Sequence, residues 1–136
     1  MKSICVFCGS NVGNQPAYRQ AAIRLGELLA AKGIRLVYGG GHVGLMGVIA
    51  DTVMANGGQV TGVIPTFLNR KEVGHHGVTE LIEVTTMHER KQLMADRSDG
   101  FIAMAGGMGT MEEMCEVLTW GQLGLHQKPF GLLNVA

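Results

Sequence analysis

The residues best suited to bind an anion lie between Gly100 and Trp120. Within this stretch, the apolar run 101–104 is too short for a helix and predicts a buried strand, whereas the apolar spacing after Thr110 predicts a helix. The glycine-rich loop 106–109 joins them. Backbone N–H groups at a helix start lack intrahelical partners and carry the positive end of the helix dipole, so this loop is suited to phosphate.

Three polar side chains follow the glycine-rich loop. Thr110 can cap the predicted helix or donate its hydroxyl to a bound anion. Glu112 and Glu113 lie in the first helical turn. One carboxylate is ordinary at a helix start, whereas a second one beside a phosphate-binding loop indicates a role on the substrate.

A second set of glycines, Gly39-x-Gly41-x-x-Gly44, follows a predicted strand and opens a helix. The spacing fits a dinucleotide-binding fingerprint, but the next strand ends at 64–66 without the acidic residue that would bind the ribose of NAD. Two interpretations remain: a backbone nest that approaches a ligand or a neighbouring loop, or glycines that allow tight packing of helix on sheet. Neither glycine loop contains Gly-Lys-Ser/Thr, so a monophosphate fits better than a triphosphate.

Two adjacent cations, Arg90 and Lys91, stand near the start of another predicted helix, which begins at Met87. The positive end of a helix dipole disfavours cations, so this placement costs stability unless an anion compensates for it. Arg90 can form a fork on phosphate or carboxylate, and Lys91 is a point charge. The alternative interpretation is a solvated helix surface.

The elements that must position these residues alternate between strands and helices. The pattern predicts strands at 3–7, 35–38, 59–64, 81–84, 101–104 and 130–134, helices at 16–32, 43–55, 87–97 and 110–125, and a long loop with one short turn at 66–79. This order predicts the α/β class: a Rossmann-like, doubly wound parallel sheet in a three-layer α/β/α arrangement. Ligands bind such sheets at the carboxyl ends of the strands, where strand order reverses. We therefore expect the strand at 3–7 to neighbour the strand at 101–104, which would bring the candidate loops together.

The 136 residues fit a single domain over 1–136, and a hydrophobic content of 46% supports a core. The formal net charge is zero and aromatic residues make up 5%, so nothing favours a nucleic-acid or membrane surface. Without a recognisable signal peptide, a cytoplasmic protein is expected. The chain stops after the last predicted strand without the helix that would cover it. We expect a short form or a fragment, and an exposed sheet face would favour a homodimer.

Cysteine and histidine usage argues for neither redox chemistry nor a metal. Cys5 and Cys8 form a Cys-x-x-Cys, but Cys5 lies in a predicted strand, so two reduced, buried thiols on opposite faces are expected. The pair His75-His76 lies in the long loop and has no neighbours at zinc-ligand spacing, which predicts surface histidines. No metal or cofactor is expected.

Three motifs resemble those of the Lonely guy (LOG) family, once labelled "lysine decarboxylase-like". They are Gly-Gly-x-Gly-Thr-x-Glu-Glu at 106–113, Met-His-x-Arg-Lys at 87–91 and Gly-Gly-Gly-x-x-Gly-Leu-Met-Gly at 39–47. The resemblance covers essentially all 136 residues. Family members usually have Pro where this chain has Ala105, a change that affects the stiffness of the loop entry but removes no donor or carboxylate. No lysine stands in a pyridoxal-phosphate context, so the old decarboxylase label is not followed.

The resemblance implies a phosphoribohydrolase that cleaves the N-glycosidic bond of cytokinin riboside 5′-monophosphates, and often AMP, to free base and ribose 5-phosphate. By this resemblance Arg90 and Glu113 are catalytic: Glu113 stabilises the oxocarbenium-like ribose and orients water, and Arg90 holds Glu113 and the substrate. The implied substrate-binding residues are Ser10, Gly41, Glu72, Met87, Lys91, Gly106, Gly107, Met108, Gly109, Thr110, Glu112 and Thr119.

Other interpretations stay open. Glu72 is also explained as a solvated charge, and Met87 and Met108 as core residues rather than an apolar base pocket. The chain as a whole could be a nucleotide- or cofactor-binding module without turnover, as the molybdenum-cofactor carriers of similar fold are. It could also be a subunit completed by a partner chain, or an inactive truncated form.

Overall fold

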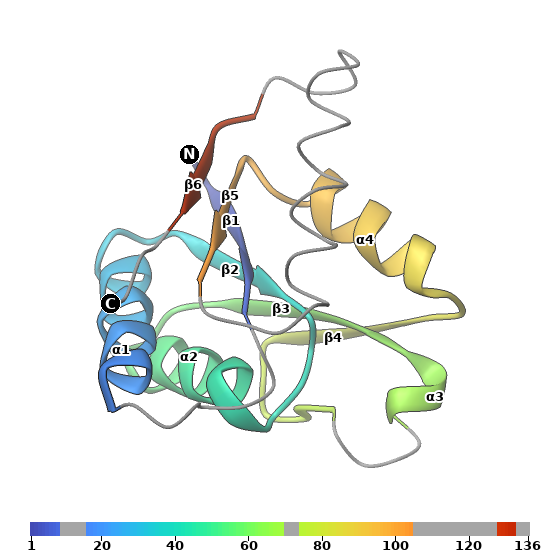
Figure 1. Cartoon of the computed structure of the whole chain (residues 1–136), viewed down its shortest axis with the longest axis horizontal. Helices are drawn as coiled ribbons and strands as arrows, with labels where there is room; N and C mark the ends of the chain where they lie inside the picture. Colours follow the sequence, from blue (N-terminus) through green and yellow to red (C-terminus); the bar gives the residue numbers. More distant parts are fainter. Residues whose placement is uncertain (9–15, 70–73, 105–127, 133–136) are drawn as a thin grey trace.

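The computed structural model describes residues 1–8, 16–69, 74–104 and 128–132. In these ranges, six parallel strands form one sheet in the order β4-β3-β2-β1-β5-β6 (Figure 1). The strands are β1 (Ser3–Phe7), β2 (Arg35–Tyr38), β3 (Val60–Pro65), β4 (Glu80–Val84), β5 (Gly100–Ala103) and β6 (Phe130–Leu132). The helices are α1 (Pro16–Ala31), α2 (Gly44–Ala55), α3 (Thr66–Asn69) and α4 (Met87–Asp96).

Strand order reverses at β1, which lies between β2 and β5. Cys5 is in register with Val37 on one side and with Phe101 on the other. This pairing confirms both the doubly wound α/β class and the expected contact between the strands at 3–7 and 101–104. The carboxyl ends of β1, β2 and β5 therefore meet at one edge of the sheet, the topological switch point.

The two faces of the sheet are covered by different helices. On one face, α1 and α2 pack over alternate strand residues such as Val6 and Leu36; on the other, Met94 and Ala95 of α4 do so. Cys5 belongs to the α4 side and Cys8 to the α1–α2 side. Both thiols are buried, so the prediction that they lie inside on opposite faces is confirmed.

The α4 side is packed around an aromatic pair. The rings of Phe7 and Phe101 lie nearly parallel with centroids 6.1 Å apart, one from each of the two strands at the switch point. At the end of α4, Lys128 Nζ donates to the carbonyl of Ala95 at 2.6 Å, where a cation is favoured by the helix dipole. These contacts fix α4 against the strands whose carboxyl ends form the candidate site.

One sequence expectation needs correction near β3. Pro65 does not end the strand early but is its last residue, in register with Val84; its missing N–H matters little at a strand end. The next four residues form the single-turn helix α3, which is the short turn expected within 66–79, and Thr66 Oγ1 donates to the carbonyl of Val84 at 3.2 Å. The predicted helix at 110–125 lies outside the described residues. Among the described helices, none has both the length and the apolar character to cross a membrane.

Asp99 joins the turn before β5 to the start of β1. Its Oδ2 accepts the backbone N–H groups of Lys2 at 2.7 Å and Ser3 at 3.0 Å. These two hydrogen bonds hold the pKa of Asp99 below its usual value. Because the folded-state pKa is depressed, the carboxylate contributes stability above its unfolded pKa, and this contribution is lost as the pH falls through the lowered folded pKa.

We expect Asp99→Asn to lower the urea midpoint of unfolding at pH 7, and the difference from the wild type to shrink below about pH 4, near the unfolded pKa of aspartate. Urea titrations at pH 7, 5 and 3 measure this. Asp96→Asn is the matched control, because the Asp96 carboxylate accepts from the Gln92 side chain rather than from β1 backbone. An Asp99→Asn deficit of equal size at pH 3 and pH 7 would contradict the assignment.

Candidate functional site

The site is built around the side chain of Arg90, which is only 7% exposed. Arg90 Nε donates to the carbonyl of Val63 at 3.0 Å, and Nη2 donates to the carbonyl of Gly39 at 2.6 Å. Its Nη1 lies 3.8 Å from the Sδ of Met87. One guanidinium on α4 therefore fastens the carboxyl end of β3 and the loop that leaves β2.

The first turn of α4 presents both cations inward. Thr86 caps the helix, because its hydroxyl oxygen accepts the N–H of Glu89 at 3.1 Å, and Glu89 Oε2 accepts the N–H of Thr85 at 3.4 Å. This arrangement approaches a capping box. Arg90 and Lys91 follow, and both are buried. The alternative of a solvated helix surface for these two cations is therefore wrong.

Gly39 is the residue that makes room for this guanidinium. A Cβ at Gly39 would overlap Nη2 of Arg90. The next residue, Gly40, has a φ of +82°, a backbone conformation that L side chains rarely adopt. Gly39 therefore makes room for a side chain from helix α4, which neither interpretation of the glycine motif predicted.

The segment 74–77 packs against the same loop. The N–H of His75 donates to the carbonyl of Gly40 at 2.8 Å, and Gly41 forms an antiparallel bridge with Gly74. His75 Nδ1 accepts the N–H of Gly77 at 3.0 Å, so Nε2 carries the proton and donates to Asp51 at 2.5 Å.

The prediction of two surface histidines needs correction at one of them. His76 is exposed, as expected, but the side chain of His75 is only 15% exposed, and it joins this segment to Asp51 of α2.

Four of the sequence-predicted site residues lie in the described part of the chain, and they come from the start of α4 and from the loop after β2. Met87, Arg90 and Lys91 belong to the first turns of α4, and Gly41 belongs to the loop that Arg90 holds through Gly39. The remaining predicted residues, Ser10, Glu72, Gly106, Gly107, Met108, Gly109, Thr110, Glu112, Glu113 and Thr119, lie outside the described residues.

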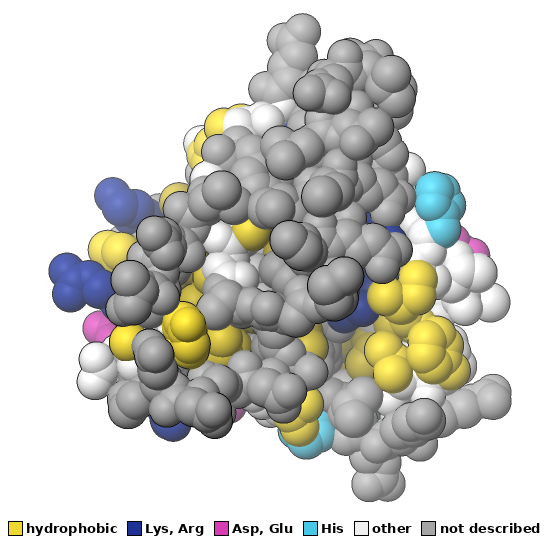
Figure 2. Space-filling view, viewed as in Figure 1, with side chains coloured by type: hydrophobic (Ala, Val, Ile, Leu, Met, Phe, Trp, Pro, Cys, Tyr) yellow, Lys and Arg dark blue, Asp and Glu magenta, His cyan; other side chains and the backbone are white. Residues whose placement is uncertain are grey.

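The described surface near this site is partly apolar. In Figure 2, hydrophobic side chains gather over α3 and the first turn of α4, next to a basic side chain. Phe67 is 50% exposed and Met87 is 38% exposed. Met87 is therefore not a core residue, and its exposed side chain beside the Arg90 guanidinium fits a position at the rim of a binding site.

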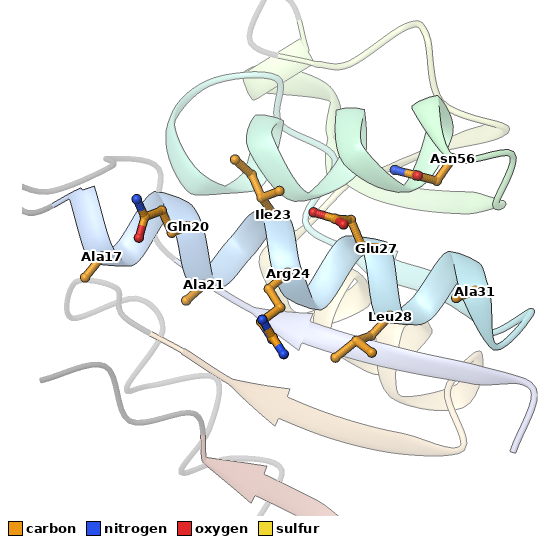
Figure 3. Close-up of a pocket in the computed structure, with 9 residues that line it drawn as sticks. All are labelled: Ala17, Gln20, Ala21, Ile23, Arg24, Glu27, Leu28, Ala31 and Asn56. Carbon is orange, nitrogen blue, oxygen red and sulfur yellow. The ribbon is translucent and has the colours of Figure 1, made fainter.

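A groove in the described part of the chain lies elsewhere. It runs along the outer side of α1 and is lined by Gln20, Arg24, Glu27 and other residues of that helix, together with Asn56 (Figure 3). It contains none of the predicted site residues and lies on a helix surface rather than at the strand ends, so it is not the candidate site. In the described ranges, no three His, Cys, Asp or Glu side chains come together as a metal site would require.

Sequence reasoning missed two contributors to the site. The hydroxyl of Tyr38 donates to the carbonyl of Gly41 at 2.8 Å, and Thr86 with Glu89 caps α4. The spacing Thr-x-x-Glu before a helix was a readable signal for the second. Nothing in the sequence marks Tyr38, because a tyrosine at the end of a buried strand is ordinary.

Comparison with known proteins shows the family of this chain. Residues 46–136 match the family model described as "Possible lysine decarboxylase". The chain is 56% identical over 134 residues to the probable cytokinin riboside 5′-monophosphate phosphoribohydrolase LOGL9 of Oryza sativa subsp. japonica. It is 54% identical over 134 residues to the cytokinin riboside 5′-monophosphate phosphoribohydrolase LOG1 of Arabidopsis thaliana. The chain belongs to the LOG family. The alignments cover 98% of this chain but 59% and 63% of the two plant proteins, so the chain spans about three fifths of the length of these relatives.

A solved structure supports the same fold for this LOG-family chain. The molybdenum cofactor binding protein from the phototrophic bacterium Rippkaea orientalis superposes with a TM-score of 0.79 at 28% identity. The match covers 98% of this chain and 77% of that protein.

The space that Gly39 leaves for the Arg90 side chain leads to a prediction about stability. We expect Gly39→Ala to lower the free energy of unfolding by about 1–3 kcal/mol, the usual cost of overpacking, because the added methyl group displaces Arg90 from the two carbonyls. Gly131→Ala is the matched control, since a Cβ there would meet its nearest neighbour, the Phe101 carbonyl, only at 3.9 Å. Chemical denaturation of both variants measures the difference, and equal stabilities would show that Arg90 does not need the space at Gly39.

Proposed function

We propose that this protein hydrolyses the N-glycosidic bond of nucleoside 5′-monophosphates, cytokinin riboside 5′-monophosphates and AMP among them, to free base and ribose 5-phosphate. The proposal rests on two motifs together: Met-His-x-Arg-Lys, whose Arg90 is buried against β3 and the loop after β2, and the adjacent carboxylates Glu112 and Glu113 that follow the glycine-rich loop in the sequence. The relatives that share more than half of its residues over nearly the whole chain are named for this reaction.

The phosphate fits the glycine-rich loop 106–109 and Thr110. The strand before that loop, β5, ends beside β1, and the N–H of Met104 donates to the carbonyl of Phe7 at 2.9 Å. The chain therefore enters this loop from the edge of the sheet at which Arg90 is fixed. Backbone N–H groups of such a loop and the following helix start would hold a phosphate without a metal.

The chemistry requires a carboxylate near the ribose. As the bond between C1′ and the base nitrogen breaks, C1′ gains oxocarbenium character, and Glu113 would stabilise this charge. A water forms the new bond to C1′ and gives its proton to Glu113, while the base departs with the electron pair of the broken bond and takes up a proton from solvent to become the free base. Glu113 then returns its proton to solvent. In this scheme Arg90 holds Glu113 ionised and oriented, Glu112 binds the ribose, and Lys91 assists at the phosphate or the ribose.

The structural likeness to a molybdenum cofactor binding protein favours a second candidate, binding without turnover. That protein is 28% identical to this chain, half the identity of the named hydrolases. A phosphate-bearing ligand would use the same edge of the sheet in either case. The two candidates differ in whether a bound nucleotide is cleaved.

Release of free base from AMP and from isopentenyladenosine 5′-monophosphate tests the proposal. We expect the purified protein to release adenine or isopentenyladenine together with ribose 5-phosphate, measured by chromatography. Glu113→Gln keeps the size of the side chain but removes its charge, so kcat should fall by about 10²-fold or more. Arg90→Lys should also be strongly impaired, because one ammonium group cannot replace the fork that spans Val63 and Gly39.

Glu27→Gln provides the control for the loss of one carboxylate. Glu27 lies on the exposed side of α1, in the groove shown in Figure 3, away from the switch point. This variant should keep wild-type activity. Binding of AMP without release of base by the wild type would instead support the second candidate, and equal activities of Glu113→Gln and Glu27→Gln would remove Glu113 from the mechanism.

A homodimer in the cytoplasm completes the proposal. Self-association would cover any sheet face that the helices leave open, and a doubly charged nucleotide does not cross a bilayer unaided. We expect light scattering after size-exclusion chromatography to give twice the chain mass of 14.5 kDa. Specific activity should fall on dilution if the partner chain completes the pocket, and constant activity across a monomer–dimer transition would show that each chain carries its own site.

A further inference from the structure

Three consecutive carbonyl groups of the loop after β2 are each held by a donor from a different part of the fold. Gly39 O accepts from Arg90 Nη2 on α4, and Gly40 O accepts from the N–H of His75. Gly41 O accepts from the hydroxyl of Tyr38, the last residue of β2, at 2.8 Å. Because C=O and the following N–H point in opposite directions across a trans peptide, each hydrogen bond fixes the orientation of one peptide plane.

We propose that Tyr38 is a positioning residue for nucleotide binding, acting through the carbonyl of Gly41. The inference rests on the proposed function and on the substrate-binding role that the family resemblance implies for Gly41. Arg90 and His75 hold the first two peptide planes, and the phenol holds the third, which leads into the start of α2. Without the Tyr38 hydroxyl, a glycine peptide has wide conformational freedom, so the loop would leave its binding conformation for part of the time.

The Tyr38 side chain is itself held rigidly. It is fully buried in the core beneath α1 and α2. A Cβ added at Gly62 would lie 3.2 Å from its Cε1 atom, which shows how closely β3 approaches the ring. The packing around the ring thus ties the position of the Gly41 carbonyl to the core.

The phenol also remains a donor at every pH at which the protein is assayed. Burial, followed by the charges of Asp51 and Cys8, raises the pKa of Tyr38 well above its usual range, and Arg90 opposes this only in part. Such a hydrogen bond does not switch with pH. Its contribution is constant preorganisation of the loop.

Preorganisation makes a distinctive kinetic prediction. If only a fraction of the molecules has the binding conformation, the apparent dissociation constant rises by the inverse of that fraction, whereas the bound complex is unchanged. Loss of the Tyr38 hydroxyl should therefore raise KM and leave kcat nearly constant. A purely structural role would lower the melting temperature without this split.

The test compares Tyr38→Phe with Tyr18→Phe, a matched loss of one phenolic hydroxyl on the half-buried side of α1. For Tyr38→Phe we expect about a tenfold rise in KM for AMP, as a lost buried hydrogen bond of ordinary strength allows, and a kcat within about twofold of the wild type. Tyr18→Phe should match the wild type in both. Hydrogen exchange of the backbone amides at 40–44 should be faster in Tyr38→Phe alone.

Calorimetric titration with AMP separates this inference from the proposed function. If the wild type binds AMP but releases no base, the hydrolase proposal fails, and the affinities of Tyr38→Phe and Tyr18→Phe still decide the role of Tyr38. Equal AMP affinities of these two variants, a fall in kcat with unchanged KM, or no AMP binding by the wild type would each overturn the inference.

Discussion

A buried positive charge is the constraint on which the rest of the site depends. The guanidinium of Arg90 is removed from water, which is costly unless its donors are satisfied. The fold satisfies two of them with the carbonyls of Val63 and Gly39, at the ends of two adjacent parallel strands. The arrangement requires glycine at position 39 and a capped first turn of α4. Gly39 and the cap of α4 thus both serve to hold the Arg90 guanidinium at the edge of the sheet.

The division of the core between the two faces explains why that edge is rigid. Alternate residues of β1 belong to separate clusters, with Val6 under α1 and α2 and Phe7 under α4. A strand buried on both faces cannot shift register without moving both clusters. The loops after β1, β2 and β5 therefore begin at strand ends that are held rigidly. Arg90, Tyr38 and His75 extend this rigidity into the loop after β2.

The sequence predicted the parallel sheet and its strand neighbours better than the side-chain contacts at the edge of that sheet. Short apolar runs separated by helical patterns give a parallel sheet, and crossover rules then bring the strands at 3–7 and 101–104 together. Motif spacing also marked Arg90 and Lys91 as site residues. It did not predict that Arg90 would bind backbone carbonyls or that His75 would reach Asp51, because these contacts join elements 24 to 51 residues apart. The short turn expected within 66–79 could not be assigned to the residues of α3, because four residues carry no helical period.

The partners of Arg90 also show which residues can distinguish a hydrolase from a binding protein of the same fold. Arg90 has a structural task that any protein with this loop arrangement would need, so its burial explains the rigidity of the site for either function. Likewise, the fold shared with a binding protein at a TM-score of 0.79 establishes the arrangement of strands and helices but not the chemistry of the site. The adjacent pair Glu112 and Glu113 has no such task in binding a phosphate, since a carboxylate repels an anionic ligand. One carboxylate is ordinary at a helix start, but a second one beside a phosphate loop is favoured when positive charge develops nearby, and that is the situation at C1′ of a ribose whose glycosidic bond is breaking.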